Sequence, residues 1–288
     1  MIRTAALLCS LLAGLATAAP ADDLLQQSQA LLRAGKLADA AEALERAVEL
    51  APDHAEAHHL LGAAYGRQAQ AAGMFGKMRL APKCRSEFER AVALAPDQVE
   101  YRESLLQYYA AAPAVVGGGV DKARAQAAEI AKRDPVRGDL AYATVAGVEG
   151  KPEEALARLR SAFTKRPDDL RLGVRLGILL QEQQRYDDAF AHFQQLVARD
   201  AAAMAAWYQL GRTSVLAKQR LTDGEAALKR YLGHLPGDQD PPLAAAHWRL
   251  GMIYELMQRV AEARAQYQAA LRFDPEHAEA KAALRKLK

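Results

Sequence analysis

The chain has 288 residues, of which 51% are hydrophobic and 25% are charged, and its formal net charge at pH 7 is +3. This length and composition permit a large buried core, and the abundance of Ala and Leu favours an all-α protein. An overall charge so close to balance gives no reason to expect nucleic acid or an acidic membrane surface as the partner.

The first 18 residues are typical of a signal peptide. Arg3 gives a positive start, residues 5–18 are apolar and uncharged, and Ala16-Thr17-Ala18 has the small-x-small pattern of a cleavage site. The apolar run of about 14 residues is shorter than the roughly 20 that a membrane-spanning helix needs. We therefore expect cleavage near Ala18, a periplasmic or secreted protein, and no transmembrane segment in the mature chain.

Seven segments of roughly 34 residues follow, and each contains two amphipathic helical patterns joined by a turn. The residues that close the pattern near the ends of these segments are Pro52, Pro96, Pro135, Pro167, Ala201 and Pro275. One further such residue is expected between the last two of these. A single repeat length of roughly 34 residues, with short insertions in some segments, explains these spacings. The segments are 21–54, 55–98, 99–135, 136–169, 170–203, 204–243 and 244–277.

The first two segments differ in how closely they follow the pattern. The first carries Gln27-Ser28 where later segments carry Leu-Gly, and such a polar end repeat is typical of a cap. The second contains Leu61-Gly62, and Cys84 stands at a small-residue position of its second helix. The sequence predicts that Cys84 is a buried apolar residue.

The second segment also has ten extra residues between its helices, around residues 70–81, which we expect to form a loop. The surrounding stretch contains no acidic residue. A solvated loop is the simplest interpretation, and a docking patch for an acidic partner or an anionic envelope polymer is the alternative. The basic residues of this insertion are Arg67, Lys77, Arg79, Lys83 and Arg85.

The third segment has an insertion at residues 111–119 that ends in three glycines. Glycines before a helix can bind phosphate through backbone amides, but the nucleotide-binding spacing is absent because Val120 and Asp121 follow the last glycine. We expect a flexible loop here, with Asp121 capping the next helix.

The last segment has the clearest pattern. Leu250, Gly251 and Tyr254 share one stripe of a first helix, and Ala263 and Tyr267 share one stripe of a second. This stretch resembles the tetratricopeptide repeat (TPR), a helix-turn-helix unit with a Leu-Gly-x-x-Tyr core and a closing proline. Leu-Gly also occurs at 176–177 and 210–211.

The resemblance implies an all-α protein, namely a right-handed α-solenoid of about seven TPR repeats. Residues 278–288 form one more amphipathic helix and are expected to be a C-terminal cap. Proteins of this family are interaction scaffolds, so the resemblance implies a protein or peptide partner, no enzymatic activity and no cofactor. Export and the lack of aromatic residues among the basic ones disfavour nucleic acid.

The resemblance also implies that first-helix side chains line the ligand groove. Trp207 stands three residues before its Leu-Gly pair, on the face of the helix that is expected to pack in the core. Trp248 stands two residues before its own pair, and because one residue is about 100° around the helix, its side chain should turn toward the groove. With Tyr208 and Arg212, Trp248 is the expected anchor for a partner. The positions implied are His59, Glu103, Gln107, Arg137, Arg171, Tyr208, Arg212, Trp248, Met252 and Glu255.

Other chemistry is not favoured. His54 and His58 share a helical face and could hold a metal. A similar short sequence surrounds His54 and His277, however, so the position of His54 in the repeat explains its presence without a metal. No catalytic motif stands out. The chain contains no asparagine, which excludes the carboxylate clamp of Lys, Arg and Asn found in chaperone-binding relatives. We therefore expect an exported scaffold or adaptor of cell-envelope assembly. The first alternative is a protein that binds an acidic partner or an anionic envelope polymer, and the second, less favoured one is a metal-dependent enzyme.

Overall fold

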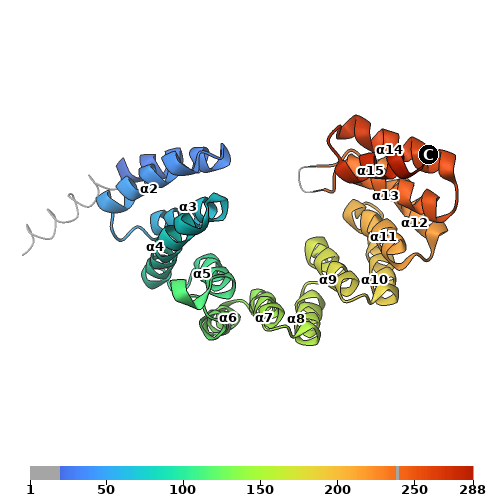
Figure 1. The fold of residues 1–288 in the computed structure, drawn as a ribbon. Coiled ribbons are helices and arrows are strands. Elements are labelled where there is room, and N and C mark those ends of the chain that lie inside the picture. The colour runs from blue at the N-terminus through green and yellow to red at the C-terminus, as the bar shows by residue number, and fades with distance from the viewer. Residues whose placement is uncertain (1–19, 238–239, 288) are drawn as a thin grey trace, which may run out of the picture. The chain divides into compact units, whose positions relative to one another are not determined.

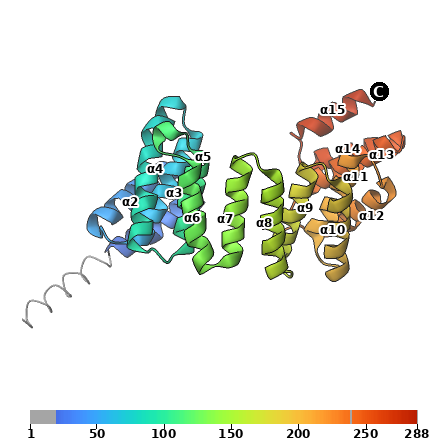
Figure 2. The same cartoon turned by 90° about the horizontal axis from the view of Figure 1, so that it is seen from below.

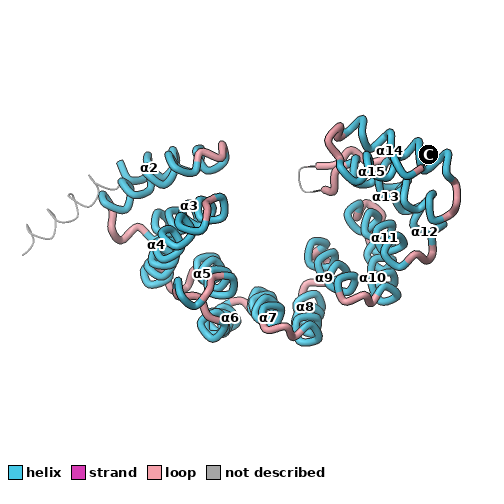
Figure 3. Tube along the Cα trace, in the orientation of Figure 1, coloured by secondary structure: helices cyan, strands magenta, loops and turns pink. Residues whose placement is uncertain are grey.

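The computed structural model describes residues 20–237 and 240–287. Helices account for the regular secondary structure of these residues, and none of them lies in a strand (Figure 3). The chain divides into two compact units, Met1–Arg158 and Leu159–Lys288, and each is considered by itself. The predicted signal peptide, residues 1–18, lies outside the described part of the chain.

Unit 1 is built from helices that pack against their neighbours in chain order (Figures 1 and 2). Leu61 of α3, Phe88 of α4 and Leu105 of α5 belong to one continuous core. After a helical stretch at 20–33, the elements are α2 (Leu37–Leu50), α3 (Ala55–Ala71), α4 (Met74–Leu94), α5 (Val99–Ala111), the 3₁₀-helix η1 (Ala114–Val116), α6 (Val120–Arg133), α7 (Pro135–Val148) and the first half of α8 (Pro152–Lys165).

Unit 2 repeats this arrangement. Here α11 contacts α9 and α13 as well as its own partner α12, so the first helices of successive pairs form a layer. Leu228, Leu250 and Tyr267 belong to its core. Its elements after α8 are α9 (Leu170–Glu182), α10 (Tyr186–Arg199), α11 (Met204–Ala217), α12 (Leu221–Leu232), α13 (Leu243–Leu256), α14 (Val260–Phe273) and α15 (Ala278–Lys286).

In the Leu-Gly pairs at 61–62, 176–177, 210–211 and 250–251, the glycine lies where a large side chain of the second helix contacts the first helix. A Cβ atom at Gly177 would lie 2.2 Å from Cζ of Phe193, and one at Gly251 would lie 2.5 Å from Cε1 of Tyr267. Both distances are far below van der Waals contact, so only glycine allows the two helices to approach this closely. Gly62 and Gly211 face Phe88 and Leu228 in the same way. The prediction of an all-α fold of paired helices is confirmed.

The histidines considered as metal ligands have other roles. Nδ1 of His54 accepts a hydrogen bond from the Ala57 amide at 3.2 Å, and this caps α3. His277 caps α15 in the same way, by accepting from the Ala280 amide. This shared role explains why the short sequence around His54 is repeated around His277. His58 is buried and bonds the Glu87 carboxylate at 2.6 Å. Over the described ranges, no three His, Cys, Asp or Glu residues are grouped as a metal site requires.

The insertion at residues 70–81 is helical, so the loop expected there is wrong. α3 continues to Ala71 and α4 begins at Met74, which makes α4 a helix of 21 residues. Pro82 lies inside α4 and cannot donate a hydrogen bond to the preceding turn. Cys84 is buried in the same helix, as predicted, and burial raises the pKa of its thiol to about 12.

The insertion at residues 111–119 lies between α5 and α6, as expected, and hydrogen bonds and the short helix η1 order it. The Gly118 amide donates to the Pro113 carbonyl at 3.2 Å, and the Tyr108 hydroxyl donates to the Val116 carbonyl at 2.8 Å. Asp121 lies in the first turn of α6 and makes no capping bond, because the N-cap residue is Gly119. Among the described residues, no helix is both long enough and apolar enough to cross a membrane.

Candidate functional site

The layer formed by α9, α11 and α13 in unit 2 carries the strongest candidate site (Figure 1). The Leu-Gly pairs give α11 and α13 a common register. Tyr208 and Trp248 stand at equivalent positions two residues before the leucine, and Gln209 and Arg249 stand one residue before it. Side chains at these positions therefore recur from one repeat to the next.

Arg249 of α13 contacts two aromatic side chains. Its Nε donates to the Tyr208 hydroxyl at 2.8 Å, and its guanidinium lies 5.5 Å from the centre of the Tyr208 ring and 5.0 Å from that of Trp248. These contacts orient the guanidinium, and among the described residues its terminal N–H groups donate to no acceptor. Tyr208 itself is only 5% exposed, so it holds Arg249 and is not the exposed anchor that the sequence suggested.

Arg212 of α11 is fixed by amide side chains. It donates to the side-chain oxygen of Gln181 in α9 and, at 3.4 Å, to that of Gln209. Gln181 in turn donates to the Thr213 hydroxyl at 2.8 Å. Gln181, Gln209 and Thr213 are all buried, so this network connects the two helices and leaves Arg212 little freedom.

In the described part of the chain, no ion pair joins Arg212 or Arg249 to an acidic side chain. Burial lowers the pKa of Arg212, and the nearby charge of Arg249 lowers it further, against weaker opposing effects of Tyr208 and Glu182. The positive charge is therefore disfavoured at this place, and a bound anion would relieve that cost. We call Tyr208, Arg212, Trp248 and Arg249 the arginine patch.

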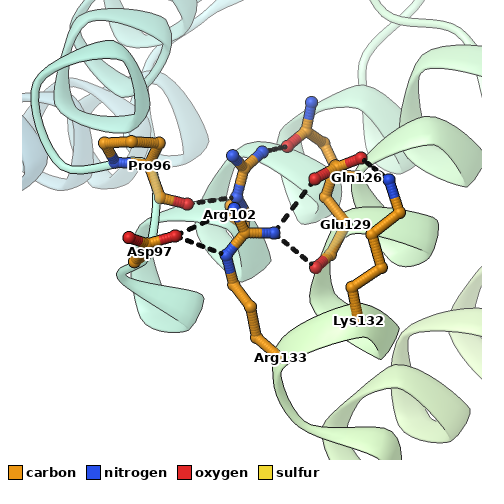
Figure 4. Close-up of polar contacts among 7 residues, drawn as sticks. All are labelled: Pro96, Asp97, Arg102, Gln126, Glu129, Lys132 and Arg133. Carbon is orange, nitrogen blue, oxygen red and sulfur yellow. Dashed lines mark hydrogen bonds and ion pairs between the residues drawn. The ribbon is translucent and has the colours of Figure 1, made fainter.

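A second arginine cluster lies in unit 1 (Figure 4). Arg102 is buried and donates to a backbone carbonyl at 2.7 Å, while Arg133 pairs with Asp97 and Glu129, each at 3.0 Å. Hydrogen bonds from Lys132 and Arg133 hold the pKa of Glu129 at about 2, well below its usual range. This cluster connects α5 to α6. Arg102 resembles Arg212 in donating to a side-chain amide, that of Gln126 at 3.0 Å, and in having its pKa lowered by burial and by a neighbouring arginine. It is only 8% exposed, however, and is therefore less accessible to a partner than the half-buried Arg212.

The two tryptophans do not differ as their phase predicted. Both are half-buried and both pack against the core of unit 2. Trp207 donates its indole N–H to the Ala201 carbonyl at 3.1 Å, and the Trp248 ring lies 5.4 Å from that of His277. A difference of one residue along the helix is therefore not enough to separate a core from a surface position here.

The remaining predicted contact residues of unit 2 are spread over the layer. Met252 is half-buried one turn after Trp248, and Arg171 is exposed near the start of α9. An open depression of about 380 Å³ lies beside Trp248, because His277 both contacts that ring and lines the depression. Its lining residues are Pro242, Leu243, Ala244, Ala245, Phe273, Asp274 and His277.

His59 lies in unit 1 and is buried, so it does not offer the exposed contact that was expected. Its ring stacks on Tyr101 with a centroid distance of 4.6 Å, and its Nε2 bonds the Ser104 hydroxyl at 2.8 Å. Desolvation lowers the pKa of His59 below its ordinary value of 6.5, although Glu100 and Glu56 oppose the shift. Its role is to connect α3 to α5.

This shift predicts that acid weakens the fold. At pH values just below 6.5 the unfolded chain binds a proton at His59 while the folded chain does not, so the free energy of unfolding should fall as pH decreases. Desolvation also lowers the pKa of His192. Urea denaturation measured from pH 8 to pH 5 gives the free energy of unfolding at each pH. This free energy should decline less with acid in His59→Gln than in the parent protein, and least in His59→Gln/His192→Gln. An unchanged slope in both variants would contradict this assignment.

The basic insertion residues have unequal surroundings. Arg67 donates to the Leu32 carbonyl at 3.1 Å, the Lys83 ammonium lies 5.1 Å from the centre of the Tyr65 ring, and Arg85 donates to the Val116 carbonyl at 3.4 Å. Lys77 and Arg79 are exposed, and within the described ranges neither forms an ion pair. Only part of the predicted basic patch is therefore available to a partner.

Helix pairs packed in chain order, with a side-chain register that recurs between pairs, define an α-helical repeat protein. Models of the TPR repeat match residues 29–68, 149–212 and 244–277. The chain is therefore a tetratricopeptide repeat protein. No curated protein sequence matches it.

Two solved structures show the same fold. A tetratricopeptide repeat protein from Parabacteroides merdae is 14% identical, with a TM-score of 0.58, and the match covers 93% of this chain and 98% of that one. A chain of the APC/C hetero-tetramer Cut9–Hcn1 is 16% identical, with a TM-score of 0.51, and the match covers 92% of this chain and 55% of that one. At these identities the likeness establishes the fold alone.

Proposed function

We propose that this chain is a scaffold that binds an acidic peptide segment of a partner protein at the arginine patch. The observation that carries this proposal is the pair of guanidiniums, Arg212 and Arg249, which are held in place by polar side chains and by no carboxylate of residues 20–237 and 240–287. A carboxylate of the partner would accept charge-assisted hydrogen bonds from both. Because the patch is already ordered, most of the ordering cost falls on the peptide.

An apolar side chain next to the acid would add to this binding. The depression beside Trp248 is lined mainly by apolar groups, including Phe273, which is 57% exposed. A leucine-sized side chain placed there would cover exposed aromatic surface. The preferred segment is therefore an acidic residue followed at short distance by an apolar one. The Cut9–Hcn1 chain belongs to a hetero-tetramer, and assembly with another protein is also the role we propose here.

Peptide binding to a single-tryptophan protein tests the proposal. Trp207→Phe leaves Trp248 as the only tryptophan. Titration with a pool of peptides that contain Glu and Leu should change the Trp248 fluorescence. A matched pool with Lys in place of Glu should leave it unchanged. Equal responses to both pools would contradict the requirement for an acid.

We further propose that the protein acts in the cell envelope, as a factor in assembly. The support is the apolar run from Ala5 to Ala18 with its cleavage pattern. Fractionation of the native cells should recover the protein outside the cytoplasm, and N-terminal sequencing should begin at Ala19. Ala18→Phe should block cleavage, because signal peptidase sites require a small residue. A cytoplasmic protein that begins at Met1 would contradict this location.

A further inference from the structure

The N-terminal part of α4, residues 74–85, has two apolar faces, and only one of them is used in packing. Leu80, Cys84 and Phe88 are buried on the inner face against the core of unit 1. On the outer face, Phe75 is 93% exposed, Met74 is 74% exposed and Met78 is 44% exposed. We call residues 74–85 the α4 extension.

These exposed side chains form a stripe. At about 100° per residue, Met74, Met78 and Phe75 fall within an arc of roughly 100° on the side opposite Leu80 and Cys84. Arg79 lies about 40° beyond Phe75 and Lys83 about 80° beyond it, whereas Lys77 lies about 60° from Met74 on the other side of the arc. A second apolar stripe with basic residues beside it is the pattern of a helix that lies in a membrane interface.

The charge of this region has one sign only. From Arg67 to Arg85 the chain contains five basic residues and no acidic one. Lys77 and Arg79 are exposed, and no ion pair involves them among residues 20–237 and 240–287. The cations are therefore available to negatively charged groups that lie next to the exposed apolar side chains.

We propose that the α4 extension docks the protein onto an anionic phospholipid bilayer. Phe75, Met74 and Met78 would enter the interface, and Lys77 and Arg79 would contact lipid phosphates. A bilayer accepts protruding apolar side chains without a matching pocket, whereas an acidic polymer would leave Phe75 in water. This surface lies in unit 1 and is independent of the arginine patch, which lies in unit 2.

Co-sedimentation with lipid vesicles tests this proposal. The full protein should bind vesicles that contain 40% phosphatidylglycerol in phosphatidylcholine, and bind phosphatidylcholine vesicles at least about tenfold less. Phe75→Ser/Met78→Ser should lower binding at least about tenfold, since the inserted apolar area is lost. Lys77→Gln/Arg79→Gln should remove the preference for the anionic lipid. Leu235→Ser, which changes an apolar residue of unit 2 that is 86% exposed, should bind as the parent does.

Three outcomes would overturn the proposal. The first is an absence of binding to the anionic vesicles. The second is full binding by Phe75→Ser/Met78→Ser, which would indicate adsorption by charge alone or binding by another segment. The third is binding to soluble polyglutamate that matches the vesicles and does not depend on Phe75, which would assign the surface to an acidic macromolecule. Circular dichroism should give equal thermal stability for all variants, because every changed side chain is exposed.

Discussion

Replacing Arg212 and Arg249 together with glutamine is expected to weaken acidic-peptide binding by about 100-fold or more. Each guanidinium would lose a charge-assisted hydrogen bond, which contributes about 1.5–3 kcal/mol, and 1.4 kcal/mol corresponds to about tenfold in affinity. Glutamine keeps a donor and most of the side-chain volume, so the loss should come mainly from charge. Isothermal titration with the peptide selected by Trp248 fluorescence measures it.

The matched control is Arg272→Gln, which removes an exposed arginine from α14 in the same unit. Affinity should change by less than about twofold in that variant, since exposed charges at a distance are screened by salt. Single variants at Arg212 and Arg249 should each lose part of the affinity. If the double variant binds as tightly as the control, the arginine patch is not the binding site.

Replacing Phe193 with alanine is expected to have the largest effect on stability. Phe193 is fully buried between α9 and α10, and its ring contacts the site of Gly177. Truncating a buried phenylalanine costs about 3–5 kcal/mol. Both tryptophans lie in unit 2, so their fluorescence during urea denaturation reports the unfolding of this unit. Phe273→Ala, at an exposed position, should cost less than about 1 kcal/mol.

A double-mutant cycle separates this contact from general loss of core volume. Gly177→Ala should destabilise the parent protein, because the new Cβ would meet the Phe193 ring. In the Phe193→Ala background the same change should cost much less, since the ring is gone. Equal costs in both backgrounds would show that the glycine is not required by this contact.

The helix pairs could be predicted because their determinants are local. Gly177 and Gly251 stand beside leucines at a spacing that recurs along the chain, and the structure shows each glycine beneath a second-helix ring. The insertions were harder to predict. Ala71, Ala72 and Gly73 interrupt the pattern as a loop would, yet the break between α3 and α4 is short and the residues after it continue as helix.

The candidate site could be predicted only in part. Sequence pattern located Arg212 and Trp248, but the pairing of Arg249 with Tyr208 depends on how α11 and α13 are placed against each other. Gln181 was missed because its partner Arg212 lies 31 residues away in the next repeat. Burial of His59 and Tyr208 was missed for a related reason, since a neighbouring repeat covers residues that would be exposed on an isolated helix.

The most direct measurement of the proposed function is photo-cross-linking in the native cells. A photoreactive phenylalanine analogue at Met252, next to the arginine patch, should form an adduct with one discrete protein. The same analogue at Gln268, exposed on α14, should form none. The Met252 adduct is expected to disappear when Arg212 and Arg249 are changed to glutamine, and the cross-linked segment of the partner is expected to contain an acidic residue. An adduct that survives both substitutions, or that forms equally at Gln268, would contradict it.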